Sequence, residues 1–311
     1  MYMQDQEEEH VATWDEVRPR LVPIVRDRYF FSRPDGIARV FLPLGDDLAV
    51  GIVIEDPKKM IYFSVEMLAY WDVSIKLIFT VACQNLFRRT SGKLQEVSEG
   101  VYRSPWSDKF DASRLALPHL FSAPVQGKPV AVAVSRNIVL VTGSEDNAGL
   151  DAVWQAVRTA RTREDFLSPT PMMLDTEWVP FLPENLAWRR ALKAHRAELY
   201  RTQSADLEEH FKEKVQIALL LPVEDAFHVT NWPPKPVTLL PVADWVTLGT
   251  IGGSSLRACN WADFRTHFAS YLGDELGFPV RISAQGFPTP EELEAVPSIS
   301  LPELLSRSVK A

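Results

Sequence analysis

The sequence predicts an α+β protein with two domains, each built from mixed or antiparallel sheets layered against helices. Short apolar runs rich in β-branched residues alternate with longer segments whose apolar residues recur every three or four positions. Several of the short runs follow one another across tight turns, which favours hairpins over a doubly wound parallel sheet. A length of 311 residues is enough for two domains that each bury a core.

Residues 48–89 carry the clearest pattern, and the rest of the chain is expected to pack around them. Residues 49–54 form a continuous apolar run, as expected of a strand covered on both faces. Pro57 and its charged neighbours predict a turn, after which residues 60–63 return as an antiparallel partner. Two helices follow, and Ser64 and Ser74 are their expected N-caps.

The second of these helices is expected to face the core, because its apolar residues recur at helical spacing. They are Ile75, Ile78, Phe79, Ala82, Leu86 and Phe87. Upstream, residues 12–27 are expected to be helical, interrupted at Pro19 and Pro23, and residues 29–31 and 38–42 to be extended.

Downstream, residues 101–103 predict a short strand, and Asp111 is the expected N-cap of a helix over 112–117. A hairpin over 129–134 and 138–142 precedes a helix over 148–161.

The composition changes between Leu167 and Pro183, where prolines are concentrated. We therefore expect a linker at 167–183 between an N-terminal α+β domain (1–166) and a C-terminal one (184–311). In the C-terminal domain the expected helices are 187–214 and 261–276. The expected strands are 215–221, 237–240, 245–248, 256–258 and 280–282.

Composition limits the classes of function. The net charge of −8, with no large Lys and Arg cluster, argues against a nucleic-acid partner. No apolar run approaches the length of a membrane span, so no membrane insertion is expected. Cys83 and Cys259 lie in different halves on apolar stretches, and the first ten residues are acidic. A cytoplasmic location is therefore expected.

Three segments of the first half resemble the YtpQ-like family of bacterial proteins of unknown function. Residues 61–86 are similar to its strand, acidic helix, Trp-Gly-Val-Ser turn and Ala-x-x-Asn-Leu helix. Residues 110–115 are similar to its Asp-x-Ser helix, and 132–137 to its strand and Arg-Asp turn. Asp72 stands where the family pattern has Gly, and Asn137 where it has Asp. The resemblance implies no reaction, cofactor or catalytic residue.

No motif marks a catalytic centre. The loop 249–255 is rich in glycine, but no Lys follows it and a strand comes next, so it predicts a hairpin loop, not a phosphate site. The histidines are scattered without the grouping that metal sites prefer, and neither a metal nor a cofactor is expected.

The polar group nearest to aromatic residues surrounds the second set of strands. It comprises His228, Asn231, Trp232, Asp244 and Trp261. As an active site it needs His228 and Asp244 within hydrogen-bond reach or bridged by substrate. The alternative is that Asp244 caps a turn and the tryptophans belong to the core.

Three functions are consistent with these patterns. The first is a non-catalytic adaptor or regulator whose partner is another protein, the second a hydrolase-type enzyme centred on His228 and Asp244. The third is a small-molecule sensor with its ligand between the domains. For the first, the proline-rich loop 231–236 is the expected binding surface, with Trp232 as anchor beside Asn231 and Lys235. The alternative for Trp232 is that it closes the core.

Overall fold

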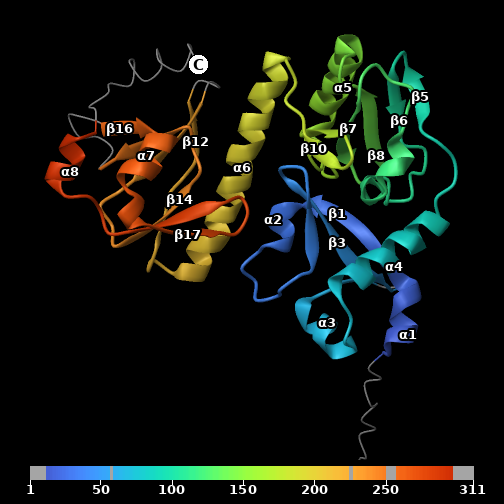
Figure 1. Cartoon of the computed structure of the whole chain (residues 1–311), viewed down its shortest axis with the longest axis horizontal. Helices are drawn as coiled ribbons and strands as arrows, with labels where there is room; N and C mark the ends of the chain where they lie inside the picture. The colour runs from blue at the N-terminus through green and yellow to red at the C-terminus, as the bar shows by residue number, and fades with distance from the viewer. Residues whose placement is uncertain (1–11, 57–58, 224–226, 250–256, 297–311) are drawn as a thin grey trace, which may run out of the picture.

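A computed structural model describes residues 12–56, 59–223, 227–249 and 257–296 of the chain. The prediction of an α+β fold is confirmed, because helices lie against four separate sheets of antiparallel or mixed strands. Figure 1 shows the N-terminal part (12–180) on one side, the C-terminal part (216–296) on the other, and one long helix between them.

The first sheet contains the predicted central unit. Its strands are β1 (Leu21–Asp27), β2 (Phe41–Leu44), β3 (Leu48–Glu55) and β4 (Met60–Tyr62). All of them run antiparallel, with β3 paired to the other three. Every residue of β3 except the last is buried, as the continuous apolar run predicts.

Two helices follow β4, as expected: α3 (Val65–Trp71) and α4 (Ile75–Arg88). The Ser74 hydroxyl accepts a hydrogen bond from the Leu77 backbone and caps α4, whereas Ser64 makes no such side-chain bond to α3. Ile78 and Phe79 of α4 are buried against the first sheet, but Ile75 and Phe87 are exposed. The buried face of α4 is therefore narrower than the apolar pattern of its sequence predicts.

Two predictions upstream of this unit are wrong in detail. Helix α1 (Trp14–Val17) and the 3-10 turn η1 (Arg18–Arg20) replace the long helix expected over 12–27, and β1 follows them at once. Residues 29–31, expected to be extended, belong to the short helix α2 (Arg28–Phe31), which the Asp27 carboxylate caps.

The second sheet has six strands in the order β10-β9-β7-β8-β6-β5. Its bounds are β5 (Gln95–Ser98), β6 (Val101–Arg103), β7 (Pro129–Ser135), β8 (Ile138–Gly143), β9 (Pro171–Leu174) and β10 (Trp178–Pro180). The hairpin β7–β8 is confirmed, and α5 (Asn147–Ala160) covers one face of the sheet. The 3-10 turns η2 (Ala112–Ala116) and η3 (Pro118–Phe121) stand where one helix was expected, and Asp111 makes no side-chain cap.

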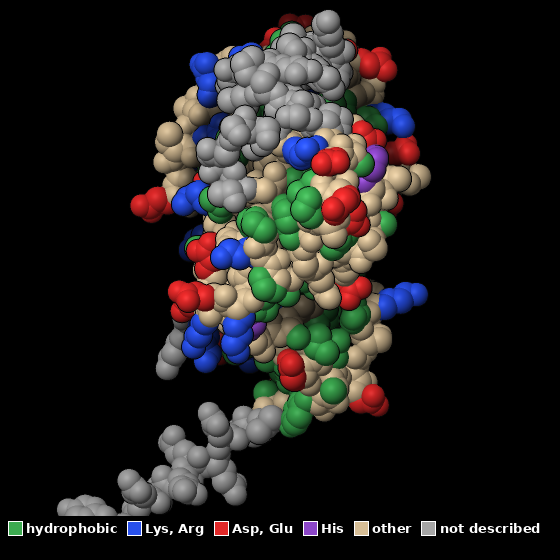
Figure 2. All heavy atoms as spheres, turned by 90° about the vertical axis from the view of Figure 1, so that its left-hand side faces the viewer, with side chains coloured by type: hydrophobic (Ala, Val, Ile, Leu, Met, Phe, Trp, Pro, Cys, Tyr) green, Lys and Arg blue, Asp and Glu red, His purple; other side chains and the backbone are tan. Residues whose placement is uncertain are grey.

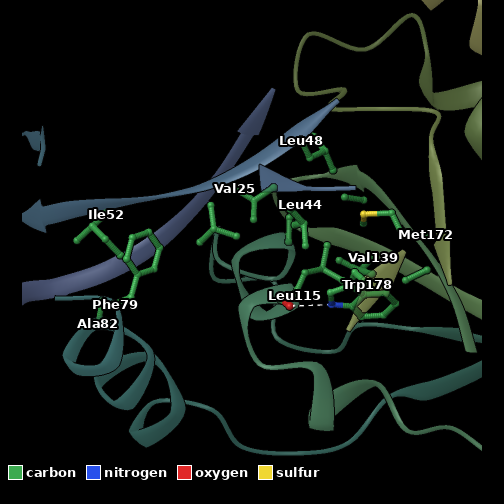
Figure 3. Close-up of a cluster of buried hydrophobic side chains, with 14 of the residues drawn as sticks. Val25, Leu44, Leu48, Ile52, Phe79, Ala82, Leu115, Val139, Met172 and Trp178 are labelled. Carbon is green, nitrogen blue, oxygen red and sulfur yellow. Dashed lines mark hydrogen bonds between the residues drawn. The ribbon is translucent and has the colours of Figure 1, made fainter. Parts of the chain in front are cut away.

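The first and second sheets share one apolar core. Figure 3 shows Val25, Leu44 and Leu48 of the first sheet beside Val139, Met172 and Trp178 of the second. The Trp178 indole also donates a hydrogen bond of 2.8 Å to the Leu115 carbonyl. The N-terminal part is thus packed around a continuous interior.

The segment 167–183 is not an unpaired linker. Strand β9 pairs with β7 and β10 with β9, and Met172 and Trp178 are buried in the shared core. Prolines are accommodated because β10 is an edge strand and Pro171 begins β9. Whether the two parts fold as separate domains stays a prediction.

The C-terminal part contains two mixed sheets around an aromatic core. One is β11 (Gln216–Ile217), β14 (Val237–Pro241), β18 (Arg281–Gln285) and β17 (Leu272–Leu276). The other is β12 (Leu221–Val223), β13 (Phe227–Trp232), β15 (Trp245–Leu248) and β16 (Arg257–Asn260). The helices are α7 (Trp261–His267) and α8 (Pro290–Glu294), with the 3-10 turn η4 (Ala269–Tyr271) after α7.

Two predictions in this part need correction. The expected strand 215–221 is divided into β11 and β12, which enter different sheets. The expected helix 261–276 ends at His267, and its last five residues form β17, paired antiparallel with β18. The predicted strands at 237–240, 245–248, 256–258 and 280–282 correspond to β14, β15, β16 and β18. Residue 256 lies outside the described residues.

Replacing Phe79 with aspartate is expected to prevent stable folding. The ring is 9% exposed in the shared core, so the variant loses its burial and places a charge against the sheet. The cost is at least about 3–5 kcal/mol, the usual loss for deleting a buried Phe. Phe87→Asp on the same helix is the matched control, because Phe87 is 52% exposed. Urea unfolding that finds the two variants equally stable contradicts this packing.

Candidate functional site

A pocket of about 490 Å³ lies where the N-terminal part, the long helix α6 (Leu186–Phe211) and the C-terminal part meet. Each part contributes a portion of its wall. The lining residues are Asp46, Asp47, Thr170, Pro180, Phe181, Leu182, Leu192, Lys193, His195, Arg196, Leu199, Tyr200, His228, Asp244, Phe278, Pro279 and Val280. This volume is within the range of small-molecule sites, which combine apolar walls with a few polar groups.

Helix α6 presents one face to the pocket. Its lining residues lie three and four positions apart over three turns, from Leu192 to Tyr200, so they share a side of the helix. The Asn185 side chain caps its first turn by accepting from the Trp188 backbone. The buried Trp188 ring stacks on Trp154 and donates to the Pro169 carbonyl, which fixes the start of α6 on the N-terminal part.

The other half of α6 is bonded to both parts of the chain. Tyr29 of α2 donates to Asp206 at 2.5 Å. From α6, the Tyr200 hydroxyl donates to the Val280 carbonyl at 2.6 Å, and the Gln203 amide to the Pro279 carbonyl at 2.9 Å. These contacts hold the β17–β18 turn, including the lining residue Phe278, beside the helix.

A buried polar group joins α6 to the turn between β2 and β3. One carboxylate oxygen of Asp47, Oδ2, accepts from the Ser168 hydroxyl at 2.6 Å and lies 2.8 Å from His195 Nε2. Asp47 and Ser168 are both buried, and the other carboxylate oxygen of Asp47 has no partner among the described residues. Two residues 148 positions apart are thereby brought into contact.

Serine, histidine and aspartate lie together here, but not in the order of a catalytic triad. In a triad the histidine takes the proton from the serine, and the aspartate bonds to the far side of the imidazole. Here the Ser168 hydroxyl donates to Asp47, and it is fully buried. The group therefore positions His195 and does not activate a nucleophile.

The structure brings His228 and Asp244 together, as the enzyme hypothesis requires, but their main bond is not between the two side chains. Asp244 accepts from the His228 backbone N–H at 2.7 Å, while its distance to ring Nδ1 is 3.7 Å. The ring Nε2 lies 2.9 Å from the Lys193 carbonyl of α6 and donates to it. The His228 ring thus joins β13 to α6, and the Asp244 carboxylate joins the loop before β15 to β13.

The hydroxyls of the pocket lining do not fit the role of a nucleophile. They belong to Thr170 and Tyr200, and Tyr200 OH donates to the Val280 carbonyl and accepts from the Val242 N–H. Neither has a hydrogen bond to a histidine among the described residues. Covalent catalysis requires a base within hydrogen-bond reach of the nucleophile.

Charges of both signs face the pocket. Burial, and then the neighbouring Asp47, raise the pKa of the Asp46 carboxyl, and the positive charge of Arg196 partly offsets this. Arg196 is exposed on α6, lies over the Tyr200 ring and makes one long hydrogen bond to the Val242 carbonyl. The charged groups of the pocket thus come from the β2–β3 turn, from one face of α6 and, through Asp244, from the loop before β15.

The remaining predicted site residues lie away from the pocket. Trp232 is fully buried and contacts the rings of Phe264, Phe268 and two further aromatic residues, so the prediction of an exposed anchor is wrong. Asn231 accepts from the Thr247 hydroxyl within the sheet. Lys235 is exposed in the turn after β13. The alternative expectation, that Trp232 closes the core, describes its observed position.

Comparison of the chain with family models, with curated proteins and with solved structures gives no match. The resemblance to the YtpQ-like family therefore stays a prediction. Asp72, where the family pattern has glycine, adopts a φ of 48°, a left-handed conformation that glycine takes without strain.

No helix among the described residues is both long and apolar enough to cross a membrane. No group of three or more His, Cys, Asp or Glu side chains within the described ranges is arranged to hold a metal ion.

Acidification is expected to destabilise the protein partly through His228. Burial lowers the pKa of the imidazole, against the opposing effects of the Lys193 carbonyl and of Asp244. Since the unfolded chain then binds the proton more readily, stability falls as pH drops from about 6.5 through the lower folded pKa. His228→Gln keeps a donor for the Lys193 carbonyl and does not titrate. The melting temperature of this variant should therefore fall less than that of the wild type between about pH 7 and pH 5. Equal decreases contradict the assignment.

Proposed function

We propose that the protein binds a small organic molecule in the pocket beside α6 and acts as a non-catalytic, ligand-responsive regulator. The observation that carries the proposal is that three separate parts of the chain line one pocket. A ligand held there contacts all three at once. Its binding energy therefore favours the arrangement in which they enclose it.

The other two hypotheses have less support. The adaptor hypothesis depended on Trp232 as a surface anchor, and that ring lies in the core. The hydrolase hypothesis needs a nucleophile or an activated water beside His228. The His228 ring is instead committed to the Lys193 carbonyl. A protein partner that reads the ligand-bound state, and a cytoplasmic setting, remain parts of the proposal.

The proposal is tested by measuring thermal unfolding in the presence of a broad panel of small metabolites. A ligand at a hundred times its Kd stabilises the folded state by about 2.7 kcal/mol, which raises the melting temperature of a chain of this length by about 4 °C. Leu199→Trp is the blocking variant, because Leu199 lines the pocket from the half-buried face of α6. Arg190→Trp is the matched control, on an exposed position of the same helix outside the pocket.

We expect at least one compound that stabilises the wild type and Arg190→Trp but not Leu199→Trp. A panel in which every stabilising compound acts equally on Leu199→Trp contradicts the proposal. So does a panel in which no compound stabilises the wild type.

A further inference from the structure

Charged side chains of opposite sign line two walls of the pocket, and His195 of α6 contacts Asp47 between them. Asp46 and Asp47 line it from the β2–β3 turn, and Arg196 lines it from α6. Asp46 and Arg196 line the same pocket, but within the described residues no ion pair of 4 Å or less joins them. A gap between a carboxylate and a guanidinium can be bridged by a ligand that carries both charges.

One carboxylate oxygen of the acidic wall has no donor among the described residues. Asp47 is 6% exposed, and both of its hydrogen bonds fall on Oδ2, which leaves buried Oδ1 without a donor in the described part of the chain. Buried polar atoms are nearly always bonded, so an unpartnered carboxylate oxygen on a pocket-lining residue is an acceptor that a ligand's donor can satisfy. The carboxylate of Asp46, one residue earlier, also accepts no hydrogen bond from the described residues. An ammonium group brings three donors and a positive charge.

Besides Lys193, His228 and Asp244, the rest of the lining includes a group of apolar side chains. Phe181 and Phe278 are half-buried, and Leu182, two residues after β10, is 66% exposed. A ligand that covers these side chains removes apolar surface from water. The Arg28 guanidinium lies 4.7 Å from the centroid of the Phe278 ring, which holds that ring in place.

We infer that the pocket takes a zwitterionic molecule of the amino-acid or short-peptide class with a large apolar side group. Its ammonium group binds beside Asp46 and Asp47, its carboxylate binds Arg196, and its apolar group packs on Phe181, Leu182 and Phe278. The inference rests on the proposed function and specifies the ligand class for the same pocket.

The test compares four probes by isothermal titration calorimetry on the full chain. L-phenylalanine and L-leucyl-L-phenylalanine carry both charges, 2-phenylethylamine carries only the ammonium, and 3-phenylpropanoate only the carboxylate. At least one zwitterion should bind, and its Kd should be at least about tenfold lower than those of the singly charged probes. Leu199→Trp should abolish this binding, since it fills the pocket.

Two variants separate the two charges. Asp46→Asn should weaken the binding of the zwitterion and of 2-phenylethylamine about tenfold or more and leave the binding of 3-phenylpropanoate unchanged. Arg196→Gln should weaken the binding of the zwitterion and of 3-phenylpropanoate and leave that of 2-phenylethylamine unchanged. Asp46 and Arg196 are both exposed, so neither change is expected to disturb folding. Arg190→Gln is the control for loss of a positive charge from the same helix.

Several outcomes overturn the inference. They are a singly charged probe that binds as tightly as the zwitterions, zwitterion binding that survives Leu199→Trp, and no zwitterion binding at concentrations up to about 10 mM. If the metabolite panel yields a ligand blocked by Leu199→Trp that lacks either charge, the inference fails while the proposed function stands. If no compound is blocked, both fail.

Discussion

Replacing Arg281 with alanine is expected to lower the free energy of unfolding by about 3–5 kcal/mol, because five hydrogen bonds and a large buried side chain are lost. The guanidinium is fully buried at the start of β18. It donates to the Gln203 amide, the Ser204 hydroxyl and three backbone carbonyls, those of Ala218, Leu239 and Tyr200. Burial lowers the pKa of Arg281 to about 10, so the group stays protonated at neutral pH.

Arg281→Lys separates charge from geometry. An ammonium group keeps the positive charge but offers three donors where the guanidinium offers five, so at least two of the five hydrogen bonds are lost. We expect a loss of about 1–3 kcal/mol for two lost hydrogen bonds, measured by urea unfolding. If Arg281→Lys is as stable as the wild type, the charge and not the hydrogen-bond geometry holds α6 to the C-terminal part.

Replacing Trp232 with alanine is expected to cost about 3–5 kcal/mol, the range for deleting a large buried aromatic side chain. Four aromatic rings lie 5.4 to 5.6 Å from it, so the variant leaves a cavity at the centre of the C-terminal core. The indole N–H has no hydrogen-bond partner among the described residues. Trp232→Phe should therefore lose less than the alanine variant.

Lys235→Ala, in the exposed turn that follows, is the control and should leave the melting temperature unchanged. The result that contradicts the core assignment is a Trp232→Ala variant with the melting temperature of the wild type. That result would indicate that Trp232 lies at the surface and would support the protein-interaction hypothesis.

Local sequence patterns predicted the elements whose partners lie nearby in the chain. Strand β3, its turn to β4 and the capped helix α4 follow one another within about forty residues, and each has a pattern of its own. The hairpin β7–β8 was predicted for the same reason. Packing of the first sheet on the second depends on side chains far apart in sequence, such as Leu48 and Met172, and no local pattern carries it.

The wrong predictions arise where apolar spacing is ambiguous. The first turns of 12–27 do form helix, but Leu21, Val22 and Ile24 also fit a buried strand, and pairing with β3 decided the outcome. Residues 272–276 extended the apolar spacing of α7, yet they become an exposed edge strand because β18 lies alongside. Tertiary pairing overrides local preference in both cases.

The candidate site could be predicted only in part. His228 and Asp244 were grouped because they are sixteen residues apart beside the same strands. The contact between Asp47 and His195 could not be predicted, since a contact across 148 residues leaves no mark in a single sequence. The spacing of Leu192, His195 and Arg196 on one predicted helix was the available sign of a shared face.

The central claim is that a small molecule binds among α6, the β2–β3 turn and the β17–β18 turn. Methyl NMR of the full chain, titrated with a compound from the panel that Leu199→Trp blocks, tests it most directly. We expect shift changes at Leu182, Leu192, Leu199 and Val280, which line the pocket. No change is expected at Leu42 and Leu44, which border a separate apolar groove beside α4. Changes centred on Leu42 and Leu44, with the pocket methyls unmoved, would place the ligand elsewhere and contradict the account.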